Sequence, residues 1–350
     1  MSALRDAGPA HLLAISGLHL GLIAGILFFT VRLLLALNEP VALRYPIKKW
    51  AAIAALIGAF GYLLLTGATI PTQRAYIMVS LILFAVLIDR EAVSMRPVAW
   101  AAVVVLVFRP ESLLGASFQL SFAAVTALVA FYEWLRARST FRSKPSLGAR
   151  WVMLYFAAVM ATTIVASLAT APFAAYLFNR VAVAGLIANL IAVPTTALWI
   201  MPWGLAAMVL MPFGLEALAL APMAWGIDLV IAIAEWCADL PGAVTLVPAW
   251  PPLFIASIAA GGLWLTLWRG TWRLWGLAPM AAGLAIALAA PRPDVLVDES
   301  GRLFAVRGQD GRLALSSKRL AKFDAGVWLR RDGTDGDAWR LPRELFHSDE

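Results

Sequence analysis

The sequence predicts an all-α polytopic membrane protein that ends in a small β-rich segment outside the membrane. Hydrophobic residues make up 62% of the 350 residues, charged residues only 14%, and the mean hydropathy is +0.81. The apolar residues gather in long runs that are separated by short polar breaks. A water-soluble domain would carry about 25% charged residues, so the composition excludes that class.

The apolar runs define the candidate helices. A helix needs about 20 residues to span the hydrocarbon core, and the candidate runs cover residues 10–37, 51–66, 71–88, 97–108, 117–135, 151–178, 182–210, 214–240, 253–268 and 274–290. The run 97–108 is too short to cross alone unless its ends are buried in protein. Pro194 and Pro202 predict a kink or a pair of half-helices in the run 182–210. We therefore expect about 8 to 11 transmembrane or re-entrant helices, some of them broken.

A change of composition near residue 290 predicts two domains. Residues 291–350 carry 11 Lys/Arg and 11 Asp/Glu, so the net charge of +7 belongs to residues 1–290. Within the tail, the runs DVLVD, RLFAVR and RLALSS are separated by Gly-containing turns. Short alternating runs between such turns are typical of a β-meander. We expect a transmembrane domain over residues 1–290 and a small meander-like extracytoplasmic tail over residues 291–350.

Basic residues in the polar breaks indicate an orientation. If each run crosses once, the basic breaks 38–50, 89–97 and 136–150 fall on one side, together with the loop 269–273. The positive-inside rule assigns that side to the cytoplasm. The loop 241–252, which has no basic residue, then lies outside, and both termini are predicted to be extracytoplasmic.

The first apolar run, AHLLAISGLHL, contains two histidines. His11 and His19 are eight residues apart, so on a helix they lie about 12 Å from each other, too far to share a metal ion. Ser16 lies within side-chain reach of His19, and Gly17 allows another helix to approach closely. This polar stripe either holds helices together by hydrogen bonds or lines a water-filled path.

The run IPTQRAYIM contains the next polar group. Pro71 stands where a helix would begin, and Arg74 follows in the first turn, on the predicted outer side. A guanidinium beside a helix N-terminus could form an anion site. Arg74 could equally extend to the outer headgroups, as arginines at membrane interfaces do.

A third polar group occurs in GASFQLSFAAVTAL. Phe118 and Phe122 are i, i+4 neighbours on the predicted helix, while Ser117 and Ser121 stack on an adjoining face. Gln119 is expected to face protein or water. Packing by small residues accounts for this pattern as well as a polar path does.

The fourth group lies in ATAPFAAYLFNR and ANLIAVP. Pro172, Asn179, Arg180 and Asn189 interrupt apolar sequence at or near membrane depth. Asn and Pro in such places indicate broken helices whose free backbone groups face a cavity. Taken alone, Asn179 and Arg180 also fit an ordinary interfacial turn.

The four runs HLLAISGLHL, PTQRAYIM, GASFQLSF and PFAAYLFNR…ANLIAVP, in this order, resemble the competence domain of ComEC-type DNA uptake proteins. The resemblance covers about residues 5–290. It implies a component of a bacterial inner-membrane channel that translocates single-stranded DNA into the cytoplasm during natural transformation. Under this interpretation the polar residues of the four runs would line the pore or DNA path: His11, Ser16, Gly17, His19, Arg74, Gln119, Ser121, Asn179, Arg180 and Asn189.

The resemblance also implies partners. They are single-stranded DNA, the lipid bilayer and the competence machinery, with a separate DNA receptor and a cytoplasmic ATPase; a homo-oligomer is compatible with it. The phosphate-binding motif GxxxxGK[ST] is absent from the sequence, so an ATP-driven motor would have to be another protein.

The sequence departs from the family pattern at both ends. Family members often carry an OB-like domain before several helices, whereas only a few residues precede the first motif here. They also often end in a metallo-β-lactamase-like domain with an HxHxDH-type cluster, but the tail holds one histidine, His347. We therefore expect no metal, no cofactor and no enzymatic activity. These departures fit a fragment, a misassigned start or a reduced family member.

Two other functions compete with the DNA channel. Broken helices and polar groups near the midplane also fit a small-solute secondary transporter. An intramembrane hydrolase built on His11, Ser16 or His19 would lack a nearby acidic residue to orient the histidine.

Overall fold

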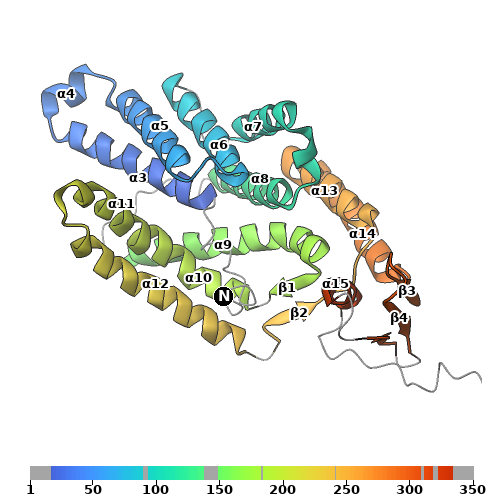
Figure 1. The fold of residues 1–350 in the computed structure, drawn as a ribbon. Coiled ribbons are helices and arrows are strands. Elements are labelled where there is room, and N and C mark those ends of the chain that lie inside the picture. Colours follow the sequence, from blue (N-terminus) through green and yellow to red (C-terminus); the bar gives the residue numbers. More distant parts are fainter. Residues whose placement is uncertain are drawn as a thin grey trace, which may run out of the picture. The chain divides into compact units, whose positions relative to one another are not determined.

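A computed structural model describes residues 17–89, 94–137, 149–182, 184–240, 242–308, 311–317 and 322–333. Seven helices in these ranges are long and apolar enough to span a membrane, and three shorter apolar helices cover Pro71–Leu87, Met95–Phe108 and Pro252–Leu267. All of these helices fall on predicted apolar runs (Figure 1). The predicted all-α polytopic membrane fold with a small C-terminal sheet is confirmed.

Contacts within the chain define two compact units, which we describe separately. The first contains Met1–Thr170 and Ala182–Ala243, and the second contains Ala171–Val181 and Val244–Glu350. These units do not test the predicted division into residues 1–290 and 291–350, which stays a prediction.

The first unit is built from helices. In chain order they are α3 (Gly17–Ala36), α4 (Glu39–Arg44), α5 (Ile47–Leu65), α6 (Ile70–Leu87), α7 (Met95–Phe108), η1 (Pro110–Leu114), α8 (Ala116–Ala137), the larger part of α9 (Ala149–Phe178), α10 (Gly185–Thr195), η3 (Thr196–Ile200), α11 (Met201–Leu210), η4 (Met211–Phe213) and α12 (Ala217–Ala238).

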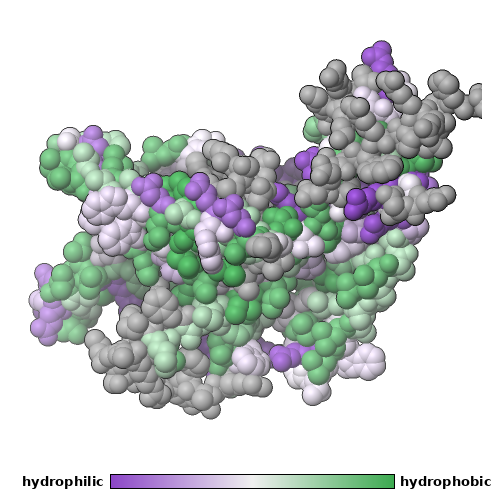
Figure 2. All heavy atoms as spheres, turned by 90° about the horizontal axis from the view of Figure 1, so that it is seen from below, coloured by the Kyte–Doolittle hydropathy of each residue, from purple (hydrophilic) through white to green (hydrophobic). Residues whose placement is uncertain are grey.

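Small side chains form the contacts between these helices, and large apolar side chains face outward. On α5, Ala51, Ala55 and Ala59 are fully buried, whereas Ile57 is 67% exposed. Figure 2 shows apolar residues over much of the surface on one face. In lipid, the hydrophobic effect does not drive large apolar side chains into the protein interior. Membrane helices instead associate through small residues, which let their backbones approach closely. The burial pattern is therefore that of a protein surrounded by lipid.

Polar contacts show which helix ends of the first unit lie together. Lys49 in the first turn of α5 forms a 2.6 Å ion pair with Asp89, which follows α6. The backbone N–H of Met95 at the start of α7 donates to Glu133 near the end of α8, at 3.1 Å. These contacts place the flanks of the basic breaks 38–50, 89–97 and 136–150 at one end of the α5–α8 helices, as the sequence predicts.

The run with Pro194 is helical from Gly185 to Leu210. Regular α10 passes into the π-helical turn η3 and then into α11, and the residues at both junctions keep right-handed helical backbone angles. A proline removes one backbone hydrogen bond, and a π-turn absorbs that irregularity without separating the helix. The predicted interruption is therefore a local π-turn and not a pair of separate half-helices.

The second unit contains a helical hairpin of α13 (Pro252–Leu267), the 3₁₀-helix η5 (Thr271–Gly276) and α14 (Leu277–Ala289). Its helices pack closely through glycines: a Cβ added to Gly261 would lie 2.4 Å from the carbonyl oxygen of Gly276. A two-stranded sheet pairs β1 (Arg180–Ala182) with β2 (Val244–Leu246).

The C-terminal segment forms the predicted meander. Strands β3 (Val295–Val297), β4 (Phe304–Arg307) and β5 (Leu313–Leu315) pair antiparallel in that order. One element was not predicted, the helix α15 (Lys322–Asp332), whose Ala325 and Leu329 pack into the core of the sheet.

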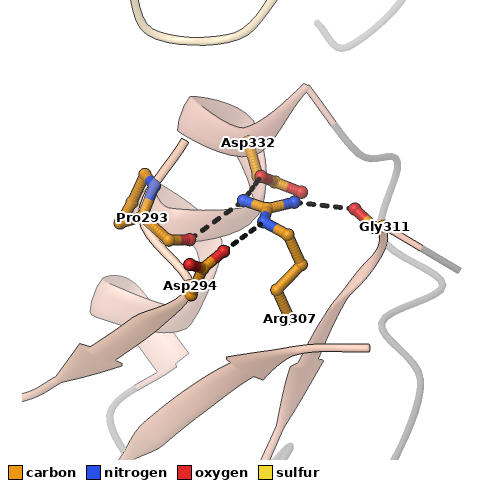
Figure 3. Close-up of polar contacts among 5 residues, drawn as sticks. All are labelled: Pro293, Asp294, Arg307, Gly311 and Asp332. Carbon is orange, nitrogen blue, oxygen red and sulfur yellow. Dashed lines mark hydrogen bonds and ion pairs between the residues drawn. The ribbon is translucent and has the colours of Figure 1, made fainter. Parts of the chain in front are cut away.

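A buried arginine ties the elements of this segment together (Figure 3). The guanidinium of Arg307 on β4 donates to Asp332 at 2.6 Å, to the carbonyl oxygen of Gly311 at 2.7 Å and to that of Pro293 at 3.1 Å. Asp294 lies 3.8 Å from the same group. One side chain thus links both flanks of the sheet to the end of α15.

Candidate functional site at the first turns of three helices

The candidate site lies at the end of the first unit opposite the basic breaks. The guanidinium of Arg74, in the first turns of α6, donates a hydrogen bond to the hydroxyl of Ser117, in the first turn of α8. Leu20 of α3 and Ala75 of α6 belong to one buried cluster, so the start of α3 packs there too. The starts of α6 and α8 each carry about half a positive charge, and they meet at this end.

Arg74 is buried, and the part of the chain that the structure describes gives it no counterion. It is 7% exposed, and among the described residues no carboxylate forms an ion pair with it. Its Nε atom is buried and has no hydrogen-bond partner, while Ser117, its hydroxyl partner, is exposed. A buried charge is costly unless it is paired. The guanidinium therefore offers unused donor capacity and positive charge to an anion that reaches the exposed side.

The turn that precedes α6 is tightly hydrogen-bonded. Thr72 is fully buried and donates to the carbonyl oxygen of Thr69 at 2.9 Å, and the Gln73 side chain donates to that of Ala68 at 2.7 Å. Ala68 has a left-handed backbone with φ of +48°, which costs a non-glycine residue about 1–2 kcal/mol. Such strained, over-determined turns cluster at functional sites, and this one fixes the first turn that carries Arg74.

The α8 residues divide between two faces as predicted. Phe118 and Phe122 are buried, with ring centroids 4.2 Å apart. Gln119 donates through Nε2 to the carbonyl oxygen of Leu113 at 3.1 Å, and its Oε1 atom is buried without a partner. Ser121 is half-buried on the next turn. The polar face therefore continues from Ser117 along the start of α8.

The predicted path residues of the first run lie at the start of α3 or outside the described ranges. His19 is buried in α3, and Gly17 begins that helix. His11 and Ser16 lie outside the described residues. Among the described residues, no group of three or more His, Cys, Asp or Glu is placed to hold a metal ion.

The three remaining residues of the predicted path, Asn179, Arg180 and Asn189, belong to two different units. Asn189 lies in α10 of the first unit, and its buried Oδ1 atom has no partner. Asn179 and Arg180 belong to the second unit. There Asn179 adopts a left-handed φ of +55° and accepts the N–H of Val247 at 3.0 Å through its carbonyl oxygen. Asn179 therefore forms the bend before β1, and Arg180 is the first residue of that strand.

Ser117 is not among the residues predicted to line the path, although it belongs to the third polar group of the sequence. Its partnership with Arg74 joins residues 43 positions apart. The available signal was its place on the polar face of the helix that also carries Ser121.

Comparisons with known proteins point to one family. A family described as "Competence protein" matches residues 1–272. "Competence protein ComA" of Neisseria gonorrhoeae is 28% identical over 330 residues, covering 93% of this chain and 43% of that protein. "ComE operon protein 3" of Bacillus subtilis is 29% identical over 59% of this chain and 24% of its own length. "Recombination protein 2" of Haemophilus influenzae is 29% identical over 67% of this chain and 29% of its own length.

The chain thus spans less than half the length of these curated relatives. No solved structure matches it.

Proposed function

Because the chain belongs to the competence protein family, we propose that it takes part in DNA uptake and that its helices translocate single-stranded DNA into the cytoplasm. We further propose the bacterial inner membrane as its location, with both termini extracytoplasmic. The chain itself performs no catalysis in this scheme. A separate receptor delivers the DNA, and a cytoplasmic ATPase draws the strand inward.

The single observation that carries the proposal is the buried guanidinium of Arg74, which no carboxylate of the described residues neutralises. Single-stranded DNA presents one phosphate per nucleotide, and phosphate oxygens accept well from arginine. The starts of α6 and α8 add positive partial charge to the same place. The end that carries Arg74 lies opposite the basic breaks, so under the positive-inside rule it faces the outside, where DNA arrives.

The small number of charged side chains that the structure describes at this end also fits translocation. Conduction requires binding that is favourable enough to admit the permeant and weak enough to release it. One guanidinium can hold one phosphate and pass the strand on, whereas a cluster of arginines would retain it. The polar face of Gln119 and Ser121 continues from Ser117 along α8 and supports passage of a hydrated backbone.

Uptake of labelled DNA by the bacterium that carries this gene tests the proposal. Deletion of the gene is expected to stop internalisation while leaving DNA bound at the cell surface. The Arg74→Gln variant should lower internalisation about tenfold or more, the effect of one charge-assisted hydrogen bond. The matched control is Arg109→Gln, which removes one positive charge at the same end of the helices from a half-buried residue after α7.

The outcomes separate the candidate functions. Normal internalisation in the deletion strain would overturn the proposal. Saturable uptake of a solute by proteoliposomes, together with normal DNA internalisation in cells, would indicate the small-solute transporter instead. Equal losses in Arg74→Gln and Arg109→Gln, at equal protein levels, would remove the specific role given to Arg74.

A further inference from the structure

The tip of the α13–α14 hairpin carries a cluster of four tryptophans. Trp264 lies 5.2 Å from Trp268 and 5.8 Å from Trp272, measured between ring centroids, and Trp272 lies 6.2 Å from Trp275. The indole N–H of Trp264 donates to the carbonyl oxygen of Trp272 at 3.2 Å. Gly270, with φ of +74°, makes the turn between the two sides. The cluster is therefore a defined structure and not four independent side chains.

The arginine and tryptophan side chains of this tip are hydrogen-bond donors. Arg269 and Arg273 flank the turn, and the sequence contains no Asp or Glu between Asp239 and Asp294. Trp268, Trp272 and Trp275 are 50%, 54% and 66% exposed. An indole nitrogen can only donate, so the side chains of the tip suit a ligand rich in acceptors and negative charge.

The surroundings of the tip are apolar. Leu267 and Leu274, beside the tryptophans, are 57% and 53% exposed. Tryptophan gathers where hydrocarbon meets lipid headgroups, because its ring is apolar and its N–H needs an acceptor. The ligand must therefore belong to a layer that offers hydrocarbon on one side and anionic acceptors on the other.

We propose that the tip Trp264–Trp275 is a binding site for acidic phospholipid headgroups. The arginines bind the headgroup phosphates, the exposed indoles donate to phosphate or ester oxygens, and the leucines enter the acyl region. Basic residues beside a membrane surface attract anionic lipids in this way. This site is independent of the proposed DNA path.

Single-stranded DNA fits the tip less well. Proteins that bind it present aromatic faces on which successive bases stack. Here the interacting rings are tilted by 42–46° and pack against one another, which occupies part of those faces. The adjoining exposed leucines offer nothing to a phosphodiester backbone.

A photo-crosslinker at the tip tests the lipid site. The full chain with Thr271→benzoylphenylalanine, an exposed position in η5, is reconstituted in vesicles that contain radiolabelled phosphatidylglycerol or phosphatidylcholine. The wild-type tip should capture phosphatidylglycerol preferentially. In the Arg269→Gln/Arg273→Gln variant, the preference should fall about fivefold per arginine removed at low ionic strength.

Two control variants keep the test independent of folding. Arg269→Lys/Arg273→Lys keeps the charge and should keep most of the preference. Arg44→Gln/Lys48→Gln removes two exposed charges at another basic break and should leave it unchanged. An unchanged preference in the glutamine variant of the tip would overturn the proposal. Capture of a radiolabelled oligothymidylate in competition with phosphatidylglycerol would overturn it in favour of DNA.

Discussion

The guanidinium of Arg74 on α6 donates to the hydroxyl of Ser117 on α8, across 43 positions of sequence. This single bond joins the first turns of two apolar helices. It also turns the charged end of a buried arginine toward an exposed residue. An intramembrane charge arranged in this way is a functional-site hypothesis by default, and the bond itself can be tested.

Ser117→Ala should destabilise the chain. The variant removes the one protein partner that the described contacts give the Arg74 guanidinium, and a hydrogen bond to a charged group contributes about 1.5–3 kcal/mol. The expected result is a lower thermal midpoint of the purified chain in detergent. Ser121→Ala, one turn further along α8, removes a hydroxyl that makes no contact with Arg74 and should leave the midpoint nearly unchanged. Equal effects of both variants would contradict the prediction.

Ala68→Gly should stabilise the chain. Ala68 has a φ of +48°, and glycine adopts such angles without the steric cost that alanine bears. We expect the free energy of unfolding to rise by about 0.5–1 kcal/mol, measured by thermal or denaturant melting in detergent. The reverse change at the neighbouring residue, Gly67→Ala, should lower it, because Gly67 has a φ of +72°.

Arg307→Gln and Asp332→Asn should each open the C-terminal segment. The two side chains are 13% and 4% exposed and lie 2.6 Å apart, and removal of one member of a buried pair costs about 3–5 kcal/mol. Hydrogen exchange of β4 and α15 amides in the full chain should accelerate accordingly. The exposed Arg302→Gln is the matched control.

The double variant Arg307→Met/Asp332→Leu refines that test. Replacement of a buried ion pair by apolar residues is often neutral, so this variant should exchange more slowly than either single variant. If the double variant instead loses as much stability to hydrogen exchange as the two single variants added together, Arg307 and Asp332 act through separate contacts.

The turn between β3 and β4 should weaken in acid. The side-chain hydrogen bond from Ser300 holds the pKa of Asp298 below its usual range, and Asp298 lies outside the membrane helices. The carboxylate therefore contributes stability above the ordinary pKa of about 3.9, and this contribution is lost as the pH falls through the lower folded-state pKa. In NMR titrations, Ser300→Ala should raise the pKa of Asp298, and an unchanged pKa would contradict the assignment.

Local patterns accounted for most of the fold. The membrane helices could be predicted because a helix needs about 20 consecutive apolar residues to span lipid. The tail strands could be predicted from alternating residues between Gly-containing turns. The contact of Phe118 with Phe122, at 4.2 Å, follows from helical spacing alone. The helix α15 could not be predicted because its sequence, KFDAGVWLRRD, has no clear apolar stripe. Gly326 and five charged residues interrupt the apolar positions.

Tertiary contacts were beyond the reach of the sequence. Arg74 could be recognised as costly in a membrane, but nothing local connects it with Ser117. The division of the polar residues between two units also depends on contacts. Asn179 and Arg180 lie in the second unit, where Arg180 begins β1, whereas Arg74 and Gln119 lie in the first unit. Residue type and spacing identify a polar group, and only the packing of helices shows which polar groups meet.

Gly261 and Gly262 offer a matched pair that tests the hairpin packing. A Cβ at Gly261 would lie 2.4 Å from the backbone oxygen of Gly276, whereas a Cβ at Gly262 would meet nothing within 4 Å. Backbone atoms of the facing element cannot rotate away, so Gly261→Ala should push the helices apart and lower the thermal midpoint. Gly262→Ala should leave the midpoint unchanged or raise it, because alanine favours a helix by about 1 kcal/mol over glycine.

The same pair of variants separates packing from helix propensity. Both replace glycine by alanine in α13, so helix propensity changes equally, and only the contacts with Gly276 and Met280 differ. Gly276 is the last residue of η5, which carries Trp272 and Trp275. Displacement of Gly276 by Gly261→Ala should therefore also shift the wavelength of tryptophan emission of the purified chain. Gly262→Ala should not shift it. If both variants melt alike, the α13–α14 contact is looser than the 2.4 Å approach implies.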